Sequence, residues 1–389
     1  MKTWSILFLI FLSGCAGMAP HTAPPLAPLF ADTAFKPPSS GINADDLFTL
    51  TPAMRSYLHR PAFAAALRQK GAAAGLVDAL YRKGDLTIQY DATRTRTAAQ
   101  TFDARAGNCL SLVVMTAAFA RELGLVVRFQ SVGVDDSWSR GNGLYLVSTH
   151  INLAIGAAPV ERLATKSSAP MLVVDFLPQK DASAFVTIEL REEDVTAMFM
   201  NNRAAEALVA GRIDDAYWWA RAAIVQQPAL IEAHNTLAVI YQRHGDLALA
   251  EKVYRAALLR EPENLVVLRN LQPVLAALGK HAEAQALDKQ LAAIDPTPPF
   301  HFFNSGVQAY ERGEFDTAKA LFAREVKRMP YVDEFHFWLA LACLRLGEVE
   351  PARVQLALAH DTATRTDTRA LYAGKLAHLR SLGAEVRYR

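Results

Sequence analysis

Hydrophobic residues in the first half of the chain follow two different periods. Residues 44–60 and 61–84 carry apolar side chains at helical spacing, which predicts short helices. Residues 110–123 are almost uncharged and end before Gly124, as expected of a buried helix. Strand-like runs follow at 125–134, 143–156 and 170–178. Helices followed by strands predict an α+β domain.

The second half of the chain repeats with a period of 34 residues. Three residue types recur at this spacing: Gly211, Gly245, Gly279, Gly313 and Gly347; Ala216, Ala250, Ala284, Ala318 and Ala352; and Pro228, Pro262, Pro296 and Pro330. Glycine supplies the positive φ of a turn between helices, and proline ends a helix because it cannot continue the hydrogen-bonded ladder. Alanine lets paired helices approach closely. The pattern resembles the tetratricopeptide repeat family over residues 197–366, which implies an all-α solenoid of five helix pairs.

Two further features follow from the repeat. Residues 367–389 are predicted to form a capping helix and tail that cover the last apolar face. Cys343 lies four residues before Gly347, where the other units carry Ala207, Tyr241, Leu275 and Ala309. We therefore interpret Cys343 as a small buried hydrophobic residue.

The first helices of such units line a concave groove. Their fifth positions carry Asn201, Asn235, Arg269, Phe303 and Phe337. One interpretation is a groove, polar at one end and aromatic at the other, that binds an extended protein or peptide. The other is that Phe303 and Phe337 simply pack between helices.

The N-terminus has the pattern of an export signal. Lys2 precedes the apolar run 4–12, which is too short to span a bilayer. Leu12-Ser13-Gly14-Cys15 resembles the bacterial lipobox, which implies a signal peptide at 1–14 and lipidation of Cys15. An ordinary secretory signal is the alternative. Because Ala16 follows, where an inner-membrane retention signal has Asp, we expect a periplasm-facing protein anchored in the outer membrane.

Composition indicates the remaining domain boundaries and the kinds of partner to expect. Residues 15–45 are rich in proline and are predicted to be a semi-extended tether, followed by globular domains at 46–195 and 197–366. The chain is 51% hydrophobic and 21% charged, and its formal net charge of +2 with no basic block argues against nucleic acid as a partner. Neither zinc-type Cys/His spacing nor a phosphate-binding glycine loop occurs, so we expect no metal and no cofactor.

Cys109 lies where a thiol is easily ionised. Asn108 is a competent N-cap, which places Cys109 in the first turn of the helix beginning there. Free N–H groups and the helix dipole favour an anion at that position. Cys109 is thus a candidate nucleophile, and its N–H, with the Asn108 side chain, is a candidate oxyanion site.

A thiolate nucleophile needs a base and a group that orients the base. His150 lies in the second strand, on its less apolar side, and Asp175 ends the third strand after three apolar residues. An Asp in that position is costly to bury without a partner. Adjacent strands would bring the carboxylate to the imidazole.

The stretches RTAAQTFDARAGNC, THINLAI and VVDFLP resemble the transglutaminase-like superfamily, which has a papain-like core. The resemblance implies Cys109 as nucleophile, His150 as base and Asp175 as orienting group. Two positions depart from the family pattern: Ile151-Asn152 replaces an aromatic after His, and Phe176-Leu177-Pro178 replaces Pro-Thr after Asp. The expected activity is a cysteine peptidase or amidase.

Two alternatives remain open on the sequence alone. In the first, the N-terminal domain is catalytically inert and the protein is an envelope scaffold acting through its repeats. In the second, Cys109 and Cys343 form a disulfide between the two domains, as an oxidising compartment permits.

Overall fold

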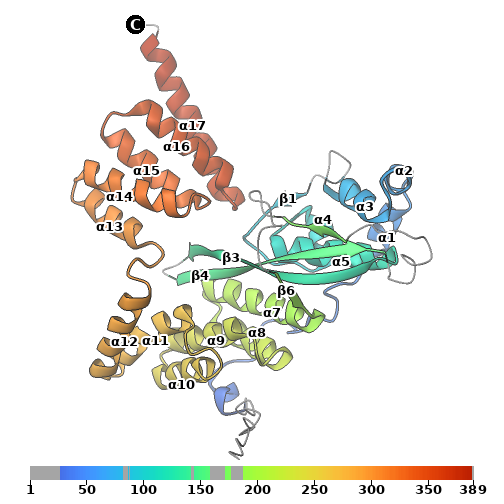
Figure 1. Cartoon of the computed structure of the whole chain (residues 1–389), viewed down its shortest axis with the longest axis horizontal. Coiled ribbons are helices and arrows are strands. Elements are labelled where there is room, and N and C mark those ends of the chain that lie inside the picture. The colour runs from blue at the N-terminus through green and yellow to red at the C-terminus, as the bar shows by residue number, and fades with distance from the viewer. Residues whose placement is uncertain are drawn as a thin grey trace, which may run out of the picture.

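The structure is a computed structural model and describes residues 27–81, 86, 88–141, 144–157, 171–176 and 187–387 of the 389-residue chain. An α+β domain precedes an array of paired helices (Figure 1). Residues 12–15, which resemble a lipobox and include Cys15, lie outside the described residues. Within the described part, no helix combines the length and the apolar content needed to cross a bilayer.

The N-terminal domain contains short helices, one long central helix and a small sheet. Its elements are α1 (Pro52–Leu58), α2 (Pro61–Lys70), α3 (Ala72–Tyr81), β1 (Gln89–Tyr90), α4 (Ala98–Ala104), β2 (Ala106–Gly107), α5 (Cys109–Glu122), β3 (Val126–Gly141), β4 (Leu144–Gly156), β5 (Leu172–Val174) and β6 (Thr187–Leu190). The segment 61–84 was predicted as one helix. Gly71, with a φ of 81°, divides its described part into α2 and α3.

The sheet has the order β5-β4-β3-β6, and all its pairs are antiparallel. In the register of β4, His150 lies opposite Val132 on β3, and Leu153 lies opposite Val174 on β5. Helix α5, buried from Cys109 to Ala120, packs against β3 and β4. Helix α5 therefore forms the centre of the domain, and its packing fixes the position of Cys109, its first residue.

The repeat region consists of five helix pairs followed by one long helix. The pairs are α7 (Glu192–Val209) with α8 (Ile213–Gln226), α9 (Ile231–His244) with α10 (Leu247–Leu258), α11 (Leu265–Ala277) with α12 (His281–Ile294), α13 (His301–Glu311) with α14 (Phe315–Arg328), and α15 (Asp333–Arg345) with α16 (Val349–Thr362). The five turn glycines all have φ between 75° and 100°, and the five alanines are all buried. Helix α17 (Thr366–Arg387) covers the end. The tetratricopeptide-like helical repeat predicted from the spacing is confirmed.

The array is interrupted between α12 and α13, which the regular spacing did not predict. The buried residues of α7–α12 share one core with the N-terminal domain, whereas those of α13–α17 form a second core. Figure 1 shows α13–α17 set apart from α11 and α12. The connecting segment 295–300 contains three prolines, and Phe300 adopts a left-handed φ of 64° with its ring fully buried. We call α13–α17 the C-terminal unit.

Residues 27–39 do not form the free tether that their composition predicted. Phe35 stacks on Tyr217 of α8 with a ring-centroid distance of 4.0 Å, and only 6% of Phe35 is exposed. Leu29 is buried as well, and its carbonyl accepts a hydrogen bond from the Tyr241 hydroxyl at 2.8 Å.

Polar contacts hold the same segment along its length. Asp32 pairs with Arg221 at 2.8 Å, and the N–H of Ser39 donates to Asp215 at 2.7 Å. Residues 27–39 are therefore part of the folded repeat region, because a few large side chains find partners far along the chain.

Two mid-helix glycines are expected to respond to alanine with opposite signs. A Cβ at Gly306 of α13 would lie 2.7 Å from the fully buried ring of Phe322, so Gly306→Ala should lower the free energy of unfolding by about 1–3 kcal/mol. A Cβ at Gly374 of α17 meets no atom within 4 Å, so Gly374→Ala should raise it by about 0.5–1 kcal/mol. Urea denaturation measures both values. Effects of the same sign would contradict the close packing of α13 on α14.

Candidate functional site

A buried hydrogen-bond network fixes the start of α5, where Cys109 is the first residue. The Asn108 Oδ1 accepts from the Ser111 N–H at 2.9 Å, and its Nδ2 donates to Thr95 Oγ1 at 2.8 Å. The Ser111 hydroxyl also accepts from the Arg96 N–H at 2.8 Å. These bonds cap the helix and hold Cys109 at the positive end of its dipole.

His150 lies between the other two residues predicted for the triad. Its Nε2 is 2.8 Å and 3.0 Å from the two carboxylate oxygens of Asp175, directly after β5. Its ring also lies close enough to the Cys109 side chain for their charges to interact. The structure thus brings Cys109, His150 and Asp175 into one line of contacts.

Asn152 explains one departure from the family pattern. It lies two residues after His150 on the same face of β4, and its Nδ2 donates to Asp175 Oδ2 at 3.2 Å. The Asp175 carboxylate is therefore held by two side chains of β4. Asn152 is fully buried, so its amide acts as a fixed support for the carboxylate.

The environment of His150 favours its charged form. Burial alone lowers the pKa of the imidazole, but hydrogen bonds to Asp175 and Cys109 and the charges of both outweigh it and raise the pKa to about 9. Since the ordinary value is 6.5, the stability contributed by the charged ring is fully present below that pH and is lost as pH rises through about 9. At neutral pH His150 carries a proton that it can donate.

Tyr90 is a site residue that the sequence did not indicate. Strand β1 pairs in parallel with β2, which places Tyr90 opposite Gly107, two residues before Cys109. The Tyr90 hydroxyl lies close to the backbone N–H and to the side chain of Cys109. Burial raises the pKa of Tyr90 far above its usual range, so the hydroxyl keeps its proton and remains a donor. No local pattern marks Tyr90, because only the β1–β2 pairing brings it here.

The structure changes the interpretation of two other candidates. The Asn108 side chain is engaged at both ends as a cap, which disfavours its predicted role as an oxyanion donor. Cys109 and Cys343 are both free, so the disulfide between domains is not formed. Cys343 is 2% exposed within α15, and burial raises the pKa of its thiol, as expected of a packing residue.

The five residues predicted to line a continuous groove have separate environments. Asn235 Oδ1 accepts from Asn270 at 2.8 Å, and Arg269 pairs with Asp295 at 2.7 Å. Among the described residues Asn201 Oδ1 is buried without a hydrogen-bond partner. Phe303 is 1% exposed inside an aromatic cluster, so the packing interpretation is correct for it.

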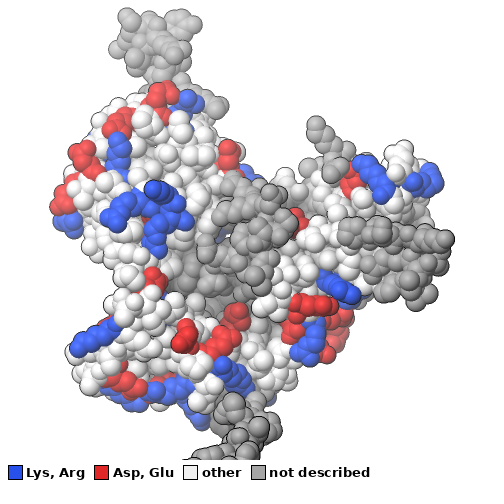
Figure 2. Space-filling view, viewed as in Figure 1, with Lys and Arg blue, Asp and Glu red and all other residues white. Residues whose placement is uncertain are grey.

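Phe337, by contrast, is half-buried and lines a cavity. The break between α12 and α13 separates Asn201, Asn235 and Arg269 from the two phenylalanines, so the row is not one continuous surface. On the face drawn in Figure 2, basic and acidic side chains are interspersed over the described part of the chain.

The rate at which Cys109 is alkylated at alkaline pH should depend on the charge of His150. Alkylation by the anion iodoacetate, relative to neutral iodoacetamide, is expected to fall as pH rises through about 9, because the imidazolium that attracts the anion is lost. Asp175→Asn should move this fall to lower pH by about 1–3 units, since it removes a charge that favours the imidazolium. The exposed Asp361→Asn serves as control. An unchanged profile in Asp175→Asn would show that the carboxylate does not act on His150.

Comparisons with known proteins concern only the repeats. No protein-family model matches the chain, and no curated protein matches it either. Solved structures that match include YrrB, "a TPR protein with an unusual peptide-binding site" (19% identity, 46% of this chain, 92% of that chain, TM-score 0.25). A thermophilic TPR protein of Thermus thermophilus matches at 22% identity, over 46% of this chain and 99% of that chain, with a TM-score of 0.31. The protein pilF of Pseudomonas aeruginosa matches at 21% identity, over 50% of this chain and 100% of that chain, with a TM-score of 0.28. With TM-scores this low, the repeat assignment rests on the helix pairs and their glycines.

Proposed function

We propose that this chain is a transglutaminase-like cysteine hydrolase, a peptidase or amidase, with Cys109 as its nucleophile. The observation that carries the proposal is the position of His150, whose ring contacts Cys109 and lies 2.8 Å from the Asp175 carboxylate. A base between a nucleophile and an orienting carboxylate is the arrangement that acyl transfer requires.

In the proposed reaction, the proton of the Cys109–His150 pair already lies on His150 before the attack, and the sulfur, as a thiolate, attacks the carbonyl carbon of an amide. A C–S bond forms, and the carbonyl π pair moves onto oxygen. The Cys109 N–H and the Tyr90 hydroxyl, which adjoin each other, bind this oxyanion at a typical value of about 3 kcal/mol per donor.

The C–N bond then breaks, and the amine leaves with the proton from His150. Water, deprotonated by His150, attacks the resulting thioester and releases the acid and the Cys109 thiol. Asp175 stabilises the imidazolium in both halves of the reaction. We favour hydrolysis over transfer to an amine, because transfer requires that water be excluded from the thioester.

We further propose that the protein acts in the bacterial cell envelope. The Leu12–Cys15 sequence supports lipidation of Cys15 and anchoring in the outer membrane, facing the periplasm. The repeat helices support binding of a protein or peptide. Metabolic labelling with an alkyne fatty acid tests the anchor: the label should be incorporated in the wild type and be absent from Cys15→Ala.

A peptide library tests the proposed activity. The full chain should release new carboxylates from some peptides, and Cys109→Ala should release none. Addition of a biotinylated primary amine separates hydrolysis from transfer, because a transferase would attach the biotin. If the wild type produces neither product above the level of Cys109→Ala, the hydrolase proposal is wrong.

The second candidate function is a non-catalytic envelope scaffold that acts through its repeats. Iodoacetamide labelling at neutral pH discriminates between the two. A hydrolase should label quickly at Cys109 while buried Cys343 stays unmodified. Equal and slow labelling of both thiols would favour the scaffold.

A further inference from the structure

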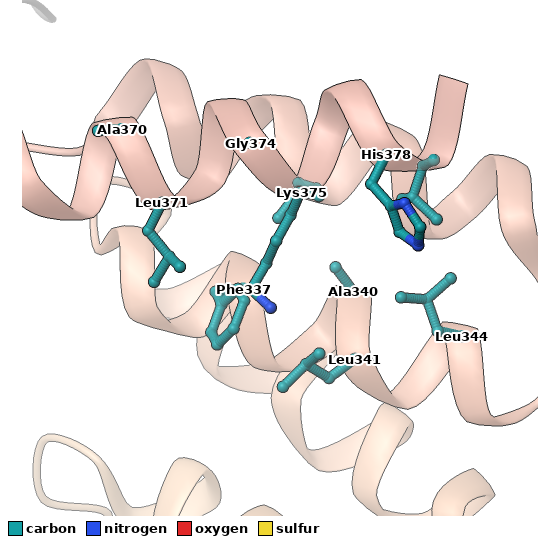
Figure 3. A pocket seen from close by; sticks show the side chains of 11 residues that line it. Phe337, Ala340, Leu341, Leu344, Ala370, Leu371, Gly374, Lys375 and His378 are labelled. Carbon is teal, nitrogen blue, oxygen red and sulfur yellow. The ribbon is translucent and has the colours of Figure 1, made fainter. Parts of the chain in front are cut away.

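An apolar groove opens between α15, α16 and α17 in the C-terminal unit. It has a volume of about 430 Å³, which lies in the range of about 300–1,000 Å³ that ligand sites occupy. Phe337, Ala340 and Leu344 form its floor on α15, and Leu371 and Gly374 lie on the α17 side (Figure 3). Leu371 is 50% exposed. The groove is therefore open to solvent.

Gly374 of α17 borders this groove. It lies in the middle of α17, where glycine costs about 1 kcal/mol of helix stability relative to alanine. No atom lies within 4 Å of the position its Cβ would occupy, so no neighbouring group requires the missing side chain. A side chain at this position would therefore enter open space at the edge of the groove.

The charges at the rim are basic. Lys375 and His378 of α17 line the groove, and its lining contains no acidic residue. Figure 3 shows Lys375 reaching across the groove toward Phe337, and its Nζ lies 5.7 Å from the ring centroid. Within the described part of the chain, no carboxylate forms an ion pair with Lys375. The groove and its rim therefore suit a ligand that carries a carboxylate next to apolar groups.

The segment that leads into α17 contacts the N-terminal domain next to the candidate active site. The carbonyl of Thr364, just before α17, accepts a hydrogen bond from the Ala92 N–H at 3.0 Å. Arg365 is close enough to Asp91 for their charges to interact. Asp91 follows Tyr90, which contacts Cys109. The two residues before α17 therefore lie beside Asp91 and Ala92, and α17 itself lines the groove from Ala370 onward.

We infer that this groove binds a segment of the protein substrate in which aliphatic side chains stand next to an acidic residue. The inference rests on the proposed function, since it assigns the groove to substrate recognition beside Cys109. Apolar side chains of the substrate pack against Phe337 and Leu344, and the acidic group pairs with Lys375. The C-terminal unit thus selects which protein reaches the thiol.

An array of short peptides tests this inference on the full chain carrying Cys109→Ala, which separates binding from reaction. The peptides carry paired leucines flanked by glutamate, lysine or glutamine. Leucine–glutamate peptides should bind best. Gly374→Leu, which places a bulky side chain at the edge of the groove, should weaken their binding by about tenfold or more, whereas Gly374→Ala should retain it. Lys375→Glu should shift the preference from glutamate to lysine peptides.

Two results would overturn the inference. One is binding that Gly374→Leu leaves unchanged while circular dichroism shows a folded chain. The other is peptide binding that is absent while a fatty acid binds the groove. An unreactive Cys109 in the wild type, with peptide binding retained, would instead overturn the proposed function and leave the groove assignment intact.

Discussion

Replacing His150 with glutamine is expected to slow alkylation of Cys109 by iodoacetamide at neutral pH by about tenfold or more. The thiolate is the reactive species, and the imidazolium of His150 interacts favourably with its charge. Glutamine keeps a polar side chain of similar reach but cannot accept the proton. Mass spectrometry of the modified peptide measures the rate at Cys109.

Cys343 provides the internal control for that experiment. It is buried within α15, far from His150 in the sequence, and its slow labelling should not change in the variant. A general loosening of the fold would accelerate both thiols. If His150→Gln leaves the Cys109 rate unchanged, the imidazole does not activate the sulfur and the hydrolase account loses its base.

Replacing Phe35 with alanine is expected to lower the free energy of unfolding by about 3–5 kcal/mol, the usual cost of removing a buried phenylalanine. Phe35 is 6% exposed and stacks on Tyr217, so its loss leaves a cavity between residues 27–39 and α8. Urea denaturation of the full chain, followed by tryptophan fluorescence, measures the change.

The exposed neighbour Thr33 gives the matched control. Thr33→Ala should alter the free energy of unfolding by less than about 0.5 kcal/mol. A tether that only links the globular domains to a membrane would be insensitive to both substitutions. Equal, negligible effects of Phe35→Ala and Thr33→Ala would therefore contradict the docking of residues 27–39.

The repeat helices were predictable because their signal is local and periodic. A glycine that needs positive φ recurs every 34 residues, and the structure gives each of the five such a φ. The break after α12 was not predictable from the same pattern. Pro296 stands where the other units also carry a closing proline, and the burial of Phe300 that follows it depends on the packing of α13 and α15.

The N-terminal segment shows the limit of composition as a guide. Proline-rich stretches usually remain extended, and residues 27–39 have that composition. Leu29 and Phe35 hold this segment against the repeats, because they contact Tyr241 and Tyr217 of the folded helices. No property of the segment alone reveals those partners.

Some residues of the candidate site could be predicted from the sequence, and others could not. Cys109, His150 and Asp175 were predictable because each has a distinctive local setting: a helix start, a polar strand face and a strand end. Tyr90 and the support from Asn152 were not, because they depend on strand pairing. Contacts within one element can be inferred from spacing, whereas contacts between elements require the fold.

The central claim is that Cys109, His150 and Asp175 act as one unit, and a double variant tests it most directly. The rate of Cys109 alkylation at neutral pH is measured in His150→Gln, in Asp175→Asn and in the variant carrying both changes. If Asp175 acts only through His150, the double variant should react at the same rate as His150→Gln. A double variant slowed by the product of the two single effects would contradict the account, because the two side chains would then act independently.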